Sequence, residues 1–113
     1  MFEHLSGKQF VDRYVLGSGW SQYPWWGPEC SQDELGLFLQ VVDDEGDEME
    51  ESGHVENDAI YGAFKHLMVS GDVPGFNALV EMRPDWLVRD IDADANDIDI
   101  VLQWALFGEV VFG

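Results

Sequence analysis

Positive charge is scarce in this chain. Five Lys and Arg residues stand against 23 Asp and Glu residues, so the formal net charge is −18 at pH 7. Like charges at this density repel one another and weaken the compact state. They also repel nucleic acid and anionic membranes, which attract basic proteins. We therefore expect the protein to bind neither nucleic acid directly nor a membrane.

Cysteine and long hydrophobic runs are scarce as well. Cys30 is the single cysteine, which excludes an internal disulfide and a zinc site built from several thiolates. No apolar run approaches the roughly 20 residues that span a bilayer, and residues 1–4 lack the basic start of a signal peptide. These absences favour a cytoplasmic protein.

Catalytic and metal-binding motifs are not recognisable. His4, His54 and His66 are scattered, and the chain has neither a G-x-S-x-G motif nor a phosphate-binding glycine loop. Residues 90–97 resemble the start of an EF-hand loop but lack its glycine and its final glutamate. Paired carboxylates have no diagnostic value where acids are so common. We expect no enzyme activity, no cofactor and no metal ion.

The composition nevertheless predicts a folded protein. Hydrophobic residues make up 46% of the chain and aromatic residues 13%, including five Trp. Acidic proteins that are disordered are poor in aromatic residues. At 113 residues the length fits one domain. We therefore predict a single acidic globular domain over residues 1–113.

Helix signals dominate the sequence. The predicted helices cover residues 6–16, 31–42, 57–69, 72–83 and 96–107. The first two start with the S-x-x-Q/E spacing of a capping box, and the fourth has Asp72 as its N-cap and Pro74 in its first turn. Residues 31–42 also allow a strand. The predicted fold is mainly α, a small single domain of about five helices, with a minor β-hairpin left open.

Residues 66–109 resemble degenerate ankyrin-type helix pairs. The resemblance rests on residues 66–72, 76–81 and 83–86, followed by residues 102–108, which are similar to the first helix of a following repeat. The resemblance implies a helix-turn-helix scaffold that binds a partner and has no catalytic role.

Two acidic groups are candidate partner-binding sites. Seven of the nine residues from 43 to 51 are acidic, namely Asp43, Asp44, Glu45, Asp47, Glu48, Glu50 and Glu51. Their low hydrophobicity predicts a mobile, solvated loop at about 43–56. A field this strong steers basic partners at long range. The second group consists of Asp90, Asp92 and Asp94.

An aromatic loop is predicted at residues 17–28, between the first two helices. It contains Trp20, Tyr23, Trp25 and Trp26 among several Gly and Pro residues. Trp and Tyr commonly anchor interfaces because they bury a large area with few rotatable bonds. We assign Trp25 and Trp26 to the partner-binding set. The alternative is that the loop folds its rings back over the core.

These features favour a protein inhibitor. We expect it to bind a basic nucleic-acid-handling protein such as a nuclease, with carboxylates that mimic the phosphates of nucleic acid. Phage anti-defence proteins have this charge and size. The alternative is a bacterial toxin-immunity or antitoxin protein that covers its toxin without mimicry. Adaptation to high salt would also explain the acidic excess. The oligomeric state is left open.

Overall fold

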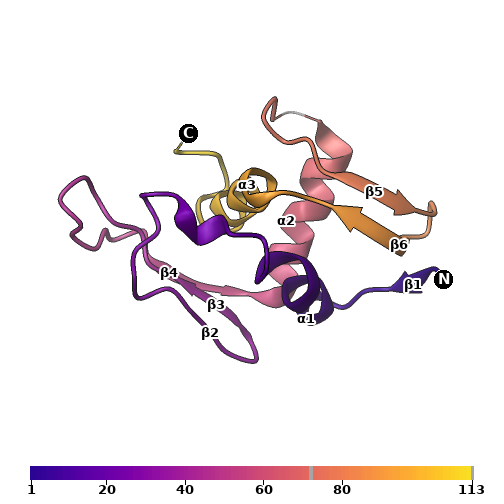
Figure 1. The fold of residues 1–113 in the computed structure, drawn as a ribbon, viewed down its shortest axis with the longest axis horizontal. Coiled ribbons are helices and arrows are strands. Elements are labelled where there is room, and N and C mark those ends of the chain that lie inside the picture. The colour runs from indigo at the N-terminus through magenta and orange to yellow at the C-terminus, as the bar shows by residue number, and fades with distance from the viewer. Residues whose placement is uncertain (72, 113) are drawn as a thin grey trace.

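Two small antiparallel sheets and three α-helices make up the fold in residues 1–71 and 73–112, which the computed structural model describes. The two sheets have three strands each, in the orders β1-β6-β5 and β2-β3-β4. The body is elongated and flat, with extents of 45 × 31 × 20 Å (Figure 1). The predicted mainly α fold with five helices is therefore wrong.

The first predicted helix, over residues 6–16, is confirmed. After β1 (Glu3–His4), α1 (Gly7–Phe10) continues into a π-helical turn, η1 (Val11–Val15). The capping box forms as predicted. The Ser6 Oγ atom accepts a hydrogen bond from the Gln9 amide at 3.1 Å, and the Gln9 Oε1 atom accepts one from the Ser6 amide at 2.9 Å.

The predicted helix over residues 31–42 is wrong, because these residues form two strands. They are β2 (Ser31–Gln32) and β3 (Gly36–Leu39), and β3 also pairs with β4 (Gly53–Glu56). The Asp33 carboxylate accepts hydrogen bonds from the amides of Leu35 and Gly36 at 2.8 and 2.9 Å, which turns the chain between the strands. A Cβ atom at Gly36 would lie 2.0 Å from the Val55 carbonyl oxygen. This close pairing with a distant strand overrides the helical pattern.

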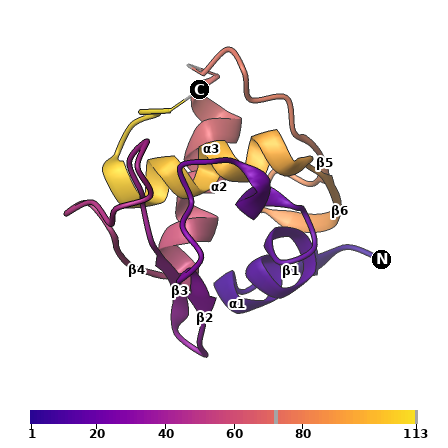
Figure 2. The same cartoon turned by 60° about the vertical axis from the view of Figure 1, so that its left-hand side comes forward.

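The other two α-helices agree with the sequence prediction. They are α2 (Asn57–Ser70) and α3 (Ala95–Phe107), and they cross between the two sheets (Figures 1 and 2). The N-cap of α3 is Asp94 rather than the predicted Asn96. Helix α3 is central, since Ile98, Val101 and Leu102 are fully buried. No helix in the described ranges is both long and apolar enough to cross a membrane.

The predicted helix over residues 72–83 is also wrong. Its described part is a loop followed by β5 (Leu79–Met82), which forms a hairpin with β6 (Leu87–Asp92). Inward-facing and exposed side chains alternate along β5, as is typical of a strand. Val80 and its partner Ile91 face inward, while Leu79 is exposed. The predicted N-cap, Asp72, lies outside the described residues. The hairpin also overturns the helix pair that the ankyrin resemblance implied.

Candidate functional site

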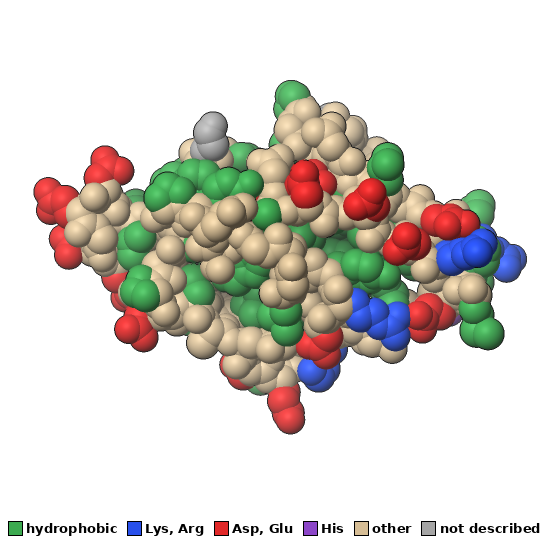
Figure 3. Space-filling view, in the orientation of Figure 1, with side chains coloured by type: hydrophobic (Ala, Val, Ile, Leu, Met, Phe, Trp, Pro, Cys, Tyr) green, Lys and Arg blue, Asp and Glu red, His purple; other side chains and the backbone are tan. Residues whose placement is uncertain are grey.

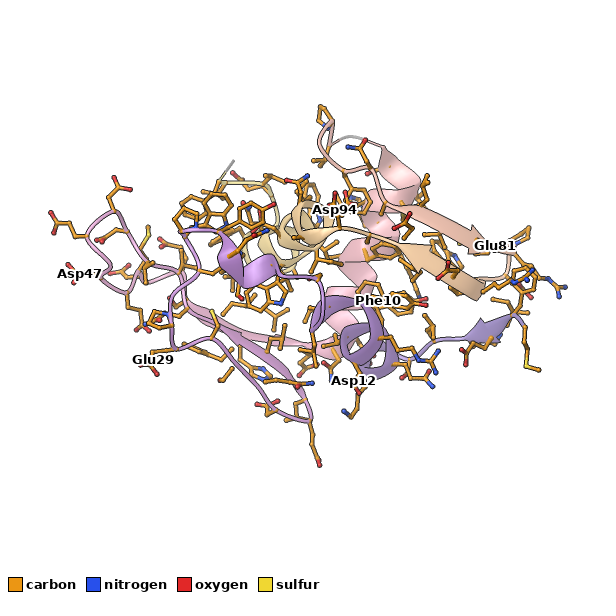
Figure 4. The ribbon with its side chains drawn as sticks, in the orientation of Figure 1. Phe10, Asp12, Glu29, Asp47, Glu81 and Asp94 are labelled. Atoms are coloured by element: carbon orange, nitrogen blue, oxygen red, sulfur yellow. The ribbon has the colours of Figure 1, made fainter. Side chains whose placement is uncertain are left out.

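The acidic loop, defined as residues 43–51, lies at one end of the long axis of the molecule. All seven of its carboxylate residues are exposed. Figure 3 shows acidic side chains gathered at this end, and Figure 4 shows Asp47 projecting from it. The structure therefore presents the loop as an accessible acidic tip.

Hydrogen bonds close the acidic loop into a turn. The Asp43 Oδ1 atom accepts from the amides of Glu45 and Asp47 at 2.9 and 3.0 Å. Val42 and Glu48 form an antiparallel bridge at the base of the turn. The predicted loop is too long, because residues 53–56 belong to strand β4. The mobility of the loop stays a prediction.

The acidic loop forms no ion pair within the part of the chain that the structure describes. The ion pairs among the described residues join Lys8 to Asp12, Arg13 to Glu3, His54 to Asp33 and Arg89 to Glu81. None involves the acidic loop. The sequence has no Lys or Arg between residues 14 and 64. The Lys and Arg side chains that are visible in Figure 3 lie away from the acidic tip. The distribution of charge is strongly asymmetric.

Asp90 and Asp92 lie on the exposed face of the β5–β6 hairpin. Asp92 pairs with Leu79 and Asp90 with Glu81, so these four side chains share one face. Asp94 has a structural role, because its carboxylate accepts the Asp97 amide at 2.9 Å and caps α3. In Figure 4 the labelled Asp47 lies far from Asp94 and from Glu81. The structure does not bring the two acidic groups together.

The two tryptophans of the candidate set occupy different environments. Trp26 is buried, with only 5% of its surface exposed, and its ring packs edge-on against Trp20 with centroids 5.7 Å apart. This is the core position of the alternative interpretation. Trp25 is partly buried and lies between the parallel rings of Tyr23 and Phe112, at 5.1 and 5.4 Å. A role for Trp25 in partner binding stays a prediction.

The buried carboxylate of Asp99, which is not one of the predicted site residues, holds both tryptophans. The Asp99 Oδ1 atom accepts hydrogen bonds from the indole nitrogens of Trp25 and Trp26 at 2.8 and 2.6 Å. The Oδ2 atom accepts one from the Gln103 side chain at 2.9 Å. Burial raises the pKa of Asp99, although these three hydrogen bonds act in the opposite direction. Asp99 therefore fixes the aromatic loop on helix α3.

Gln103 fastens the C-terminal segment to the same helix. This residue is fully buried. Its Oε1 atom accepts the amides of Val111 and Phe112 at 2.9 and 2.8 Å, and its Nε2 atom also donates to the Phe112 carbonyl oxygen at 3.1 Å. Two polar residues four positions apart, Asp99 and Gln103, interrupt the apolar sequence of α3 after its polar first turn. That spacing was the signal from which this network could have been found.

An apolar cleft lies between the aromatic loop and the acidic loop. Its volume is about 530 Å³. The residues that line it are Pro24, Trp25, Val42, Asp43, Asp44, Gly46, Met49 and Phe112. A second hollow of about 550 Å³ is lined by Tyr23, Asp99 and Ile100 and shares Trp25 and Phe112 with the first. The Trp25–Phe112 stack therefore separates two hollows.

Replacing Gln103 with Ala should release the C-terminal segment. The amides of Val111 and Phe112 would lose their acceptor, and we expect the free energy of unfolding to fall by about 2 kcal/mol. Hydrogen exchange followed by NMR should show faster exchange at both amides. The exposed Gln22→Ala is the control and should change neither quantity. Unchanged exchange at residues 111 and 112 would show that Gln103 does not hold the segment.

The free energy of unfolding should rise as the pH falls from 7 towards the ordinary pKa range of aspartate. Burial raises the pKa of Asp97 and that of Asp99, so the folded state takes up protons before the unfolded state does. Their contribution to stability is full below the unfolded pKa of about 3.9 and is lost as the pH rises through the folded values. Relief of charge repulsion acts in the same direction. Urea unfolding at a series of pH values from 7 down to about 4 tests this, and Asp99→Asn should flatten the dependence on pH. Equal stability at all of these pH values would contradict it.

Neither an activated thiol nor a metal-binding cluster is found among the described residues. Burial raises the pKa of the Cys30 thiol, which disfavours the reactive thiolate. No three His, Cys, Asp or Glu side chains in the part of the chain that the structure describes are grouped so that they could hold a metal ion. No protein-family model, curated protein or solved structure matches the chain. The acidic loop and the features around it therefore form the candidate functional site.

Proposed function

We propose that this protein is a cytoplasmic inhibitor that binds a basic nucleic-acid-handling protein, such as a nuclease. In this proposal the carboxylates of the acidic loop occupy the positions that phosphates of nucleic acid would take. One observation carries the proposal. Seven exposed carboxylates lie on a hydrogen-bonded turn at one end of the molecule, and none of them belongs to an ion pair among the described residues.

The energetics support a role for this charge in binding. Unpaired like charges repel one another and destabilise the folded state. Seven acidic residues among the nine from 43 to 51 should therefore lower the free energy of unfolding. Adaptation to salt does not require such a local concentration. A basic groove built to bind phosphates would supply the missing countercharge, and the long-range field would speed the encounter. Asp90 and Asp92 add to that field from a separate surface.

The protein itself should not bind duplex DNA at physiological salt. Its net charge is −18, and the Lys and Arg residues are few and scattered along the chain. Fluorescence anisotropy of a labelled duplex, titrated with the protein, should stay flat. A basic DNA-binding protein of similar size serves as the positive control. Micromolar affinity for DNA would contradict the inhibitor proposal.

Capture from host extract with matched variants tests the proposed function. The Asp44→Asn/Asp47→Asn variant and the Asp90→Asn/Asp92→Asn variant remove equal charge from the acidic loop and from the hairpin. We expect the wild type and the hairpin variant to retain a basic protein that a salt gradient elutes, and the loop variant to retain less of it. Stronger loss with the hairpin variant would contradict the proposal. A captured protein that still binds nucleic acid would indicate coverage without mimicry, as in the immunity or antitoxin alternative.

A further inference from the structure

We propose that the apolar cleft beside the acidic loop receives an apolar side chain of the partner, presented next to a Lys or Arg residue. The assignment rests on the proposed function and names the kind of surface that the partner must offer. It differs from phosphate mimicry alone, which requires carboxylates but no apolar contact. The cleft and the acidic loop are adjacent, because Asp43 and Asp44 also line the cleft.

The walls of the cleft come from three separate segments. Trp25 belongs to the aromatic loop and Phe112 to the C-terminal segment. Val42 directly precedes the acidic loop, and Met49 lies within it. The volume of about 530 Å³ is within the range of pockets that enclose small ligands. A Leu or Phe side chain is smaller than this. Figure 3 shows hydrophobic side chains exposed beside the acidic end of the molecule.

Hydrogen bonds hold these walls in place before a partner arrives. The Val42 amide donates to the Trp25 carbonyl oxygen at 2.9 Å, which ties the aromatic loop to the base of the acidic loop. The Met49 amide donates to the Val41 carbonyl oxygen at 2.7 Å. Gln103 fixes Phe112 against Trp25 through its hydrogen bonds to the C-terminal segment. A cleft formed in advance needs little ordering on binding.

Charge complementarity selects the occupant. Asp43 and Asp44 are exposed at the cleft, and neither takes part in an ion pair among the described residues. An apolar side chain in the cleft would bring its neighbours in the partner's chain close to these carboxylates. A basic neighbour would gain attraction there, whereas an acidic one would be repelled. The fitting segment is therefore apolar and basic together.

Two capped peptides of equal charge test the assignment, Arg-Leu-Arg and Arg-Ser-Arg. We expect the Leu peptide to bind about tenfold more tightly, because its apolar side chain is transferred from water into the cleft. In NMR spectra of the wild type, the Leu peptide alone should shift the signals of the Met49 methyl group and the Trp25 indole N–H. Met49→Gln should remove the preference for Leu, whereas Leu79→Ser, on the distant exposed hairpin face, should leave it intact.

The outcomes distinguish binding in the cleft from binding to the acidic loop alone. Equal affinities for the two peptides, with shifts confined to the acidic loop and a steep dependence on salt, would overturn the cleft assignment and leave the proposed function standing. No binding of the Leu peptide at millimolar concentration would overturn it too. If Met49→Gln fails to fold, the wild-type spectra decide alone. Affinities that do not depend on salt would count against the proposed function itself.

Discussion

Association with the basic partner is expected to slow by about 100-fold at low salt when the acidic loop is neutralised. The variant replaces each Asp by Asn and each Glu by Gln at positions 43, 44, 45, 47, 48, 50 and 51. Amides keep the hydrogen-bond acceptor that Asp43 supplies to the turn, so the loop should keep its shape. Stopped-flow mixing over a series of salt concentrations measures the rate. The dependence of the rate on salt should become shallow.

The loop and hairpin double variants serve as the matched control for this effect. Both change the net charge equally, so a field that depends only on net charge would slow association equally in both. A local site predicts a larger effect from Asp44 and Asp47 than from Asp90 and Asp92. An equal effect would show that the acidic loop contributes to steering but is not the contact surface. Unchanged circular dichroism would confirm that each variant is folded.

Asp99→Ala is expected to cost about 3 kcal/mol of folding free energy at pH 7, a large part of the stability of a small domain. The substitution leaves the buried indole N–H of Trp26 without its acceptor and removes one of the two acceptors of the Gln103 side-chain NH2 group. Removal of a buried charge offsets part of the loss. Urea unfolding followed by tryptophan fluorescence measures the change.

Asp99→Asn separates the hydrogen bonds of this residue from its charge. The amide oxygen can still accept from both indoles, although the amide NH2 cannot accept from Gln103, so we expect a smaller loss of stability than with Ala. The dependence of stability on pH should also weaken, since the titrating group is gone. If Asp99→Ala is as stable as the wild type, the network does not hold the aromatic loop to helix α3.

Local signals predicted the parts of the fold that depend on local structure. The capping box at Ser6 and the apolar periodicity of residues 57–69 and 96–107 correctly indicated helices. The errors at residues 31–42 and 72–83 arose because strand pairing depends on distant partners. Neither the contact of Gly36 with strand β4 nor the pairing of Val80 with Ile91 can be read from a helical pattern.

The same distinction between local features and distant contacts applies to the candidate site. The acidic loop could be found from sequence because exposed charge needs no tertiary partner. The burial of Trp26 could not, since it depends on Asp99, a residue 73 positions away. The apolar cleft likewise joins the aromatic loop, the acidic loop and the C-terminal segment, which only the folded chain brings together.

Competition with DNA for the isolated partner tests the central claim most directly. A labelled duplex is bound to the partner, the protein is titrated in, and anisotropy and native mass spectrometry follow the complexes. Mimicry of phosphates predicts complete displacement of the duplex, a competition that weakens as salt rises, and no ternary complex. A stable ternary complex of partner, duplex and protein would contradict the account.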